Sequence, residues 1–212
     1  MALEILHRGV RAADQPGPAR LAVFPGAFNP PTIAHLEIAR AAAEWADEVL
    51  WVIPRAFPHK VFDGAPFGPR CSMLAALAQS QPGFSAATSE GGLYGEIAEE
   101  ARCHFGEATQ IALVCGRDAA ERLVEWDYGD PHYVDRMLER CRILVATRRG
   151  EYQPPERHSS RITTLSLAAS HDFVSSSEVR RRIEKGRDWR ELVPAAIHEQ
   201  IRAVYGAPRF DE

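Results

Sequence analysis

The sequence lacks both glycine-rich motifs that commonly bind nucleotide phosphates, since neither G-x-G-x-x-G nor G-x-x-x-x-G-K-[ST] occurs in its 212 residues. Its four cysteines form no C-x-x-C pair and have no metal-ligand spacing with histidine, which indicates reduced, mostly buried cysteines and predicts no metal site built from protein ligands. The first twenty residues include Glu4, His7, Arg8 and Arg11 and no long apolar run. They therefore fit neither a signal peptide nor a membrane span, and we expect a cytoplasmic protein.

An excess of positive charge is also missing. Lys and Arg number 25 against 29 Asp and Glu, which gives a formal net charge of −4. This balance argues against general binding to nucleic acid, and we expect neither a nucleic-acid nor a membrane partner. Any basic patch must then be local, as a site for a triphosphate would be.

What the chain does contain is an alternation of strand-like and helix-like segments. Its length and 45% hydrophobic content suffice for one substantial core. The runs typical of strands cover residues 21–24, 48–53, 109–115, 142–147 and 162–167, and the helical patterns cover 33–45, 70–79 and 93–104. This alternation predicts an α/β fold: a Rossmann-like, doubly wound parallel sheet with helices on both faces and ligands at the carboxyl ends of the strands.

We expect these elements to form one compact domain in three parts. Residues 1–20 are an N-terminal extension, and residues 21–173 form the Rossmann-like core. Residues 174–212 add a small C-terminal helical segment. No internal repeat divides the chain further.

The most informative segment is residues 21–40, LAVFPGAFNPPTIAHLEIAR. An apolar strand ends at a Gly/Pro turn, in which Gly26 lets the backbone approach a ligand closely. Thr32 can cap a helix that begins at Ile33, so His35 lies in its first turn. The unpaired amides of a first turn favour an anion, which predicts a phosphate site beside a histidine. The simpler alternative is a strand, turn and helix with a surface histidine.

A second helix start near the C-terminus has the same character. In residues 174–183, VSSSEVRRRI, Ser175 and Glu178 are spaced as a capping box. Arg180 follows Ser176 by four residues, one turn further along the same face, where its guanidinium could grip a phosphate with two hydrogen bonds. We expect the two arginines that follow it to be solvated. The alternative is an ordinary capped helix with a basic face.

Both segments resemble motifs of one enzyme superfamily. GAFNPPTIAH, residues 26–35, resembles the GxFxPxHxGH signature of HIGH-type nucleotidyltransferases, in which Thr is allowed for the first His. VSSSEVR resembles the ISSTxxR motif of the same superfamily. Asn29 stands where Asp is common, and Ala34 stands where Gly is common but leaves His35 a clear path to a phosphate. The resemblance implies transfer of AMP or CMP from a nucleoside triphosphate to a phosphate or alcohol, with release of pyrophosphate.

Other segments resemble bacterial nicotinate (nicotinamide) mononucleotide adenylyltransferases in particular. Residues 52–60, VIPRAFPHK, resemble a strand-end segment that typically ends in PPHK, and residues 174–206 resemble the C-terminal end of these enzymes. Residues 90–96, EGGLYGE, depart from a Ser-Tyr-Thr segment that helps recognise the nicotinate carboxylate, because they lack the threonine. The resemblance spans most of residues 21–206, dense at both ends and thin in the middle. It implies adenylyl transfer from ATP to a mononucleotide in NAD biosynthesis.

The resemblance also implies roles for individual residues. The catalytic pair would be His35 and Arg180. The ATP site would use Gly26, Ala27, Phe28, Thr32, His35, Gly116, Asp118, Ser175, Ser176 and Arg180. The acceptor site would use Asn29, His59, Lys60 and Trp126. Taken alone, His59 and Lys60 fit a surface loop, Asp118 fits a helix N-cap, and Trp126 fits a core aromatic position.

The mechanism we expect follows from the charges of the substrates. ATP and a mononucleotide bring several negative charges together, so positioning and electrostatic stabilisation carry the catalysis, with in-line attack and no covalent intermediate. A cationic His35 and the amides near Gly26 and Phe28 would stabilise the α-phosphate, while Arg180 and Ser176 hold the β and γ phosphates. Mg²⁺ would bridge the phosphates largely through water and phosphate oxygens, without a protein carboxylate cage.

Several alternatives stay open. Pantetheine-phosphate adenylyltransferase has a similar first motif, but that family is usually shorter and lacks the PHK loop and this tail. A cytidylyltransferase would use CTP in place of ATP. A nucleotide-binding regulator without turnover is the alternative of a different class, whereas a class I tRNA synthetase fragment is disfavoured because no KMSKS-like segment occurs. The sequence leaves open the choice between nicotinate and nicotinamide acceptors, homo-oligomer formation and the role of residues 1–20.

Overall fold

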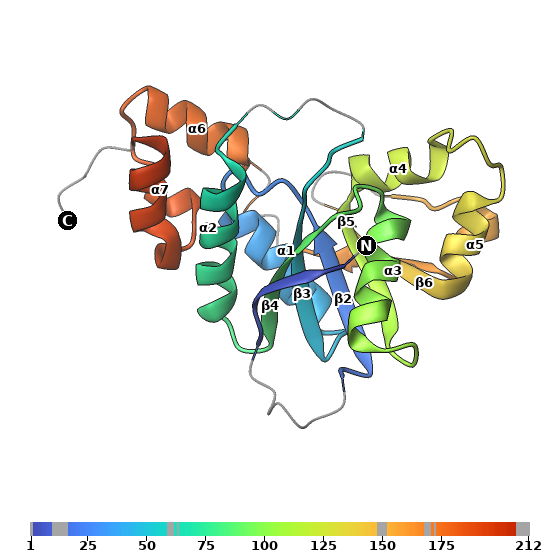
Figure 1. Ribbon diagram of the computed structural model, residues 1–212. Helices are drawn as coiled ribbons and strands as arrows, with labels where there is room; N and C mark the ends of the chain where they lie inside the picture. Colours follow the sequence, from blue (N-terminus) through green and yellow to red (C-terminus); the bar gives the residue numbers. More distant parts are fainter. Residues whose placement is uncertain are drawn as a thin grey trace.

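The computed structural model describes residues 2–9, 17–58, 62, 64–147, 152–167, 171 and 173–206. They form a seven-stranded sheet with helices on both faces (Figure 1). The strands are β1 (Glu4–His7), β2 (Arg20–Pro25), β3 (Glu48–Pro54), β4 (Phe84–Ser89), β5 (Gln110–Gly116), β6 (Cys141–Thr147) and β7 (Ile162–Ser166). The helices are α1 (Ile33–Ala43), α2 (Phe67–Gln79), α3 (Tyr94–Phe105), α4 (Arg117–Glu125), α5 (Tyr133–Arg140), α6 (Ser176–Glu184) and α7 (His198–Tyr205). Short 3₁₀ turns cover Glu156–His158, Arg190–Leu192 and Ala195–Ile197.

The sheet is doubly wound, which confirms the predicted fold class. Its strand order is β1-β4-β3-β2-β5-β6-β7, and all neighbours are parallel except β1, which runs antiparallel to β4 at the edge. The chain moves outward from β2 through β3 to β4, then returns to β5 on the other side of β2. The carboxyl ends of β2 and β5 therefore lie side by side at the point where the winding reverses, which is where ligands bind in open α/β sheets.

Alternate residues of each strand serve two separate cores. In β2, Ala22 and Phe24 pack in one cluster with α1, α2, α6 and α7, whereas Leu21 and Val23 pack in another with α3, α4 and α5. Figure 1 shows these two helix layers on opposite faces of the sheet. Successive side chains of a strand point to opposite faces, so a run that is apolar at every position needs a helix layer on each side.

Every strand and helix that the sequence predicts is present, with ends that differ by up to three residues. The sequence patterns do not predict β1, β4, α4 or α5. β4 reads FSAATS, a run of small and polar residues that is nevertheless fully buried between β3 and β1. The strand is buried because of its place in the sheet, and the hydrophobicity of its own residues does not predict that place.

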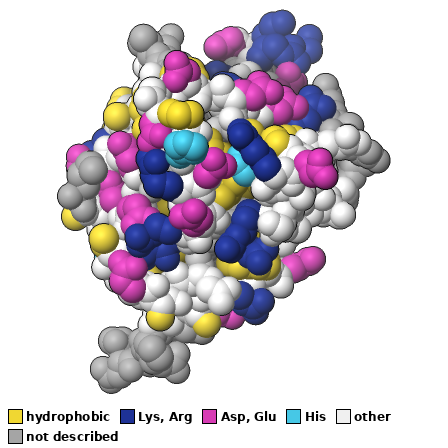
Figure 2. Space-filling model, turned by 90° about the vertical axis from the view of Figure 1, so that its right-hand side faces the viewer, with side chains coloured by type: hydrophobic (Ala, Val, Ile, Leu, Met, Phe, Trp, Pro, Cys, Tyr) yellow, Lys and Arg dark blue, Asp and Glu magenta, His cyan; other side chains and the backbone are white. Residues whose placement is uncertain are grey.

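The surface and the cysteines agree with the composition. On the face drawn in Figure 2, basic and acidic side chains are interspersed, with no broad patch of one sign. All four cysteines are free; Cys71, Cys115 and Cys141 are buried and Cys103 is exposed. Among the described residues no helix has the length and apolar character needed to cross a membrane.

The N-terminal extension is held to the sheet by a buried carboxylate. Glu48, at the start of β3, is 3% exposed. It accepts a hydrogen bond of 3.1 Å from Nη2 of Arg8 and one of 2.6 Å from the hydroxyl of Ser85 in β4. The Ser85 hydroxyl in turn accepts the Gly9 amide at 2.7 Å. The residues that follow β1 therefore complete the hydrogen bonding of a charge inside the sheet.

Arg8→Ala should lower the free energy of unfolding by about 1.5–3 kcal/mol, because it leaves the buried Glu48 carboxylate without its cation. The control is Arg20→Ala, which removes an ion pair with Asp47 in which both side chains are at least 30% exposed. That change should cost less than about 1 kcal/mol. Urea unfolding of the three proteins measures both values. Equal losses in the two variants would show that the extension adds no stability through this contact.

Candidate active site

The turn after β2 brings the backbone close to an aromatic cluster. Phe28 is 2% exposed with φ of 44°, and its ring packs against Phe24 and Trp51 with centroid separations of 5.6 and 5.2 Å. A Cβ at Gly26 would lie only 2.8 Å from the Phe28 ring. Glycine is therefore required at position 26 by packing within the protein. Any contribution of Phe28 to a phosphate site must come from its backbone amide, because its side chain belongs to the core.

Thr32 caps helix α1, as the sequence predicts, and it also contacts the ring of His35. The Thr32 hydroxyl accepts the His35 amide at 3.4 Å and lies 2.7 Å from Nδ1 of His35. The Thr32 amide donates to the same Nδ1 at 3.1 Å, which completes a reciprocal capping box. Nδ1 faces the Thr32 amide, so a proton donated from this ring to a ligand would come from Nε2. The expected cationic state of His35 stays a prediction.

The two motifs at opposite ends of the chain are in direct contact. Nη1 of Arg180 donates to the carbonyl of Asn29 at 2.6 Å, and the Ser176 hydroxyl donates to the carbonyl of Pro30 at 2.7 Å. Nη2 of Arg180 lies 3.4 Å from the Ser177 hydroxyl. Helix α6 is thus bonded to the turn that precedes His35, so the two motifs meet at this turn.

The side chain of Asn29 holds this turn in place. It is 5% exposed, and its Oδ1 accepts the Tyr205 hydroxyl at 2.6 Å and the Ala65 amide at 3.2 Å. The sequence predicts Asn29 as an acceptor-binding residue, but its carboxamide oxygen is already shared between α7 and the segment before α2. Arg70 also stabilises this turn, because its Nη1 donates a hydrogen bond to the Ala27 carbonyl at 2.8 Å.

A cavity opens beside His35 at the switch point of the sheet. Its volume is about 630 Å³, and His35, Gly116, Asp118 and Ser175 line it together. Gly116 ends β5 and is the N-cap of α4, so Asp118 lies in the first turn of that helix and is not itself the cap. Four residues predicted for the ATP site therefore share one space. We call it the His35 cavity.

A second, smaller cavity adjoins the other side of the turn. It has a volume of about 270 Å³, and its lining includes Gly26, Ala27, Tyr94, Trp126 and Tyr128. Trp126 was predicted to contact the acceptor and is 45% exposed at this cavity. Only Ala119 and Arg122 of helix α4 line both cavities. We call the second space the aromatic pocket.

Comparison with known proteins decides the family. A family model described as cytidylyltransferase-like matches residues 23–182. The chain belongs to this family. The probable nicotinate-nucleotide adenylyltransferase of Anaeromyxobacter dehalogenans is 31% identical over 197 residues, which cover 88% of this chain and 96% of that protein. The protein of the same description from Thermus thermophilus is 30% identical and covers 86% of this chain and 96% of its own length.

A solved structure matches the fold of this cytidylyltransferase-like protein. The nicotinic acid mononucleotide adenylyltransferase of Plasmodium falciparum, complexed with NaAD, superposes with a TM-score of 0.66 at 16% sequence identity. The match covers 89% of this chain and 98% of that chain. The resemblance to HIGH-type nucleotidyltransferases and the Rossmann-like architecture are therefore confirmed, and the protein is a nucleotidyltransferase related to the nicotinate-nucleotide enzymes.

Sequence reasoning placed some residues of this cytidylyltransferase-like site and missed others. His59 and Lys60 lie outside the described residues, so their acceptor role stays a prediction. The sequence patterns did not identify Arg70, which is 3% exposed. Its sequence signal is an arginine within an apolar helix, because a buried charge needs partners inside the protein. Arg122 was missed because it follows no motif, and only the fold brings it between the two cavities.

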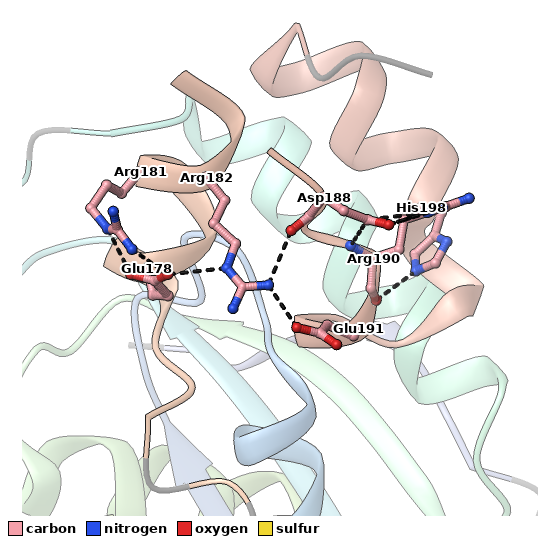
Figure 3. A network of polar contacts seen from close by, with 7 residues as sticks. All are labelled: Glu178, Arg181, Arg182, Asp188, Arg190, Glu191 and His198. Carbon is pink, nitrogen blue, oxygen red and sulfur yellow. Dashed lines mark hydrogen bonds and ion pairs between the residues drawn. The ribbon is translucent and has the colours of Figure 1, made fainter. Parts of the chain in front are cut away.

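The arginines after Arg180 are paired with acids, as Figure 3 shows. Glu178 accepts hydrogen bonds from Arg181 at 2.6 and 2.7 Å and from Arg182 at 3.0 Å. Arg182 also bonds Glu191 at 2.7 Å. This corrects two expectations: these arginines are not merely solvated, and Glu178 does not return a bond to Ser175, whose hydroxyl alone caps α6. The positive charge of α6 is thus largely neutralised beyond Arg180.

Hydrogen bonds from Arg181 and then Arg182 lower the pKa of Glu178 from its ordinary 4.5 to about 2. A carboxyl whose folded pKa is depressed stabilises the fold above its unfolded pKa and loses that contribution as the pH falls. Glu178→Gln should therefore lower the urea midpoint most above pH 5, and the difference from the parent should shrink between about pH 4.5 and pH 2. Glu184→Gln, which removes a carboxylate of the same helix without an ion pair among the described residues, should show no such trend. A Glu178→Gln deficit that is constant with pH would reject the assignment.

Proposed function

We propose that this protein transfers the adenylyl group of ATP to nicotinate mononucleotide, forming the dinucleotide of NAD biosynthesis and releasing pyrophosphate. The observation that carries the proposal is the bond from Arg180 to the Asn29 carbonyl, because it joins the two phosphate motifs into one site. The names of the curated relatives support this acceptor. The two adjoining cavities support a reaction between two nucleotides.

The larger cavity suits the triphosphate. His35 and Ser175 approach it from two helix starts, whose free amides favour anions. Asp118 offers a carboxylate that could accept hydrogen bonds from ribose hydroxyls. The aromatic pocket suits the base of the acceptor, because Trp126 and its tyrosines provide flat apolar surface for a pyridine ring. An acceptor phosphate would then meet the α-phosphate near Gly26, between the two cavities.

The chemistry is a direct displacement at phosphorus. An oxygen of the acceptor phosphate forms a bond to the α-phosphorus as the bond to the β-phosphate oxygen breaks, and pyrophosphate carries that electron pair away. The Nε2–H of His35 would donate to an α-phosphate oxygen, where negative charge is most crowded in the transition state. Arg180 and Ser176 would hold the departing pyrophosphate, with Arg180 exchanging part of its bonding to the Asn29 carbonyl for phosphate oxygens.

The residues of this site fit an Mg²⁺ ion that binds together with ATP. Among the residues described, no group of three His, Cys, Asp or Glu side chains could enclose a metal ion. Of the described residues that line the His35 cavity, Asp118 is the only one with a carboxylate. A site with one carboxylate and substrate phosphates is the kind that Mg²⁺ occupies while keeping several waters. The ion would neutralise charge on the phosphates, and Asp118 would be the residue that helps to hold it.

His35→Ala should reduce turnover by at least about a hundredfold, because it removes a donor aimed at developing charge. Pyrophosphate release from ATP, Mg²⁺ and nicotinate mononucleotide gives the rate, and circular dichroism checks the fold. His132→Ala is the matched control, since that side chain is 75% exposed and lies in neither cavity. A His35→Ala variant with normal turnover would reject the mechanism.

The same assay separates the alternative functions. CTP in place of ATP would support turnover in a cytidylyltransferase, and phosphopantetheine would serve as acceptor in a pantetheine-phosphate adenylyltransferase. ATP binding without pyrophosphate release from any of these mixtures would identify a regulator.

A further inference from the structure

Arg122 has a position that the nucleotidyl transfer described above does not use. It lies on α4 and lines both cavities, and among the residues that the structure describes it is the only charged one that lines the aromatic pocket. The other side chains with polar atoms that line it are Tyr94, Trp126 and Tyr128. Burial raises the pKa of Tyr94 well above its ordinary value of 10, so that hydroxyl stays neutral. Within the described part of the chain, Arg122 is therefore the cation that an anionic group on a ring bound in this pocket would meet.

A neighbouring carbonyl orients the guanidinium of Arg122 but does not occupy all of its hydrogen-bond donors. Its Nε donates to the carbonyl of Asp118 at 3.0 Å, which fixes the base of the fork. Its two Nη groups make no hydrogen bond or ion pair with any described residue. Arg117, on the same helix, differs because it pairs with the carboxylates of Asp118 and Glu121. Of these two arginines, only Arg122 lines the aromatic pocket.

The spacing on α4 sets the ring and the charge side by side. Trp126 follows Arg122 by four residues, and its amide donates to the Arg122 carbonyl at 2.9 Å. Residues four apart lie on one face of a helix, one turn from each other. A pyridine ring stacked on Trp126 would therefore present a substituent toward the guanidinium.

We propose that Arg122 selects acceptors whose pyridine ring carries a carboxylate over those that carry a carboxamide. A guanidinium has five donors and no acceptor, so it bonds both oxygens of a carboxylate. The same fork would face the NH₂ group of a carboxamide donor to donor, leaving that group unpaired. The proposal rests on the proposed function and adds the residue that discriminates between the two mononucleotides.

The test compares kcat/KM for nicotinate and nicotinamide mononucleotides in the parent protein, Arg122→Leu and Arg122→Gln. Both variants should lose at least about tenfold with the acid and change less than about twofold with the amide, so the preference collapses. Arg117→Leu removes the same charge from the same helix outside the aromatic pocket, and it should leave the ratio between the two acceptors unchanged. KM for ATP is measured alongside.

Three results would overturn the proposal. Equal losses of kcat/KM with both acceptors would show that Arg122 binds the phosphate that they share. A rise confined to the KM for ATP would show that Arg122 binds the triphosphate. Parent values of kcat/KM with both acceptors would show that Arg122 has no role in acceptor choice. If the parent protein transfers AMP to neither acceptor, the proposed function fails instead. Calorimetric titration with nicotinate mononucleotide alone then tests Arg122, because tighter binding of the acid by the parent than by Arg122→Leu needs no turnover.

Discussion

The site depends on two hydrogen bonds between the ends of the chain. Arg180 and Ser176 donate to the carbonyls of Asn29 and Pro30, so the start of α6 is fixed against the turn that precedes α1. These partners are about 150 residues apart in sequence. This contact brings two helix starts, positions that favour an anion, to one turn, and in the proposed function both act on one triphosphate.

The sheet order supplies the rest of the geometry. Because the winding reverses between β2 and β5, the turn at Gly26 and the β5 end at Gly116 are neighbours. Helix α4 starts at that β5 end and runs between the two cavities, with Asp118 in the first and Trp126 in the second. One helix thus lines both cavities, and Arg122 is one of its residues that line the two.

Much of this could be predicted from the sequence, for physical reasons that differ by element. Strands such as β3 and β5 are apolar at nearly every position, since both faces of the sheet are covered. β4 has no such signal, because small polar residues are buried there by their neighbours. His35 and Arg180 follow from motifs with local capping chemistry. The bond from the Thr32 amide to Nδ1 of His35 and the place of Arg122 do not, because the first depends on a backbone amide direction and the second on packing across α4.

Coupling between the two ends of the chain is the central claim, and binding of a non-hydrolysable ATP analogue tests it most directly. Calorimetry on the parent, His35→Ala, Arg180→Ala and the double variant gives a thermodynamic cycle. The account predicts that the two losses are non-additive by more than about 1 kcal/mol, because both side chains hold one triphosphate across a shared turn. Losses that add within about 0.3 kcal/mol would contradict it, since independent sites behave in that way.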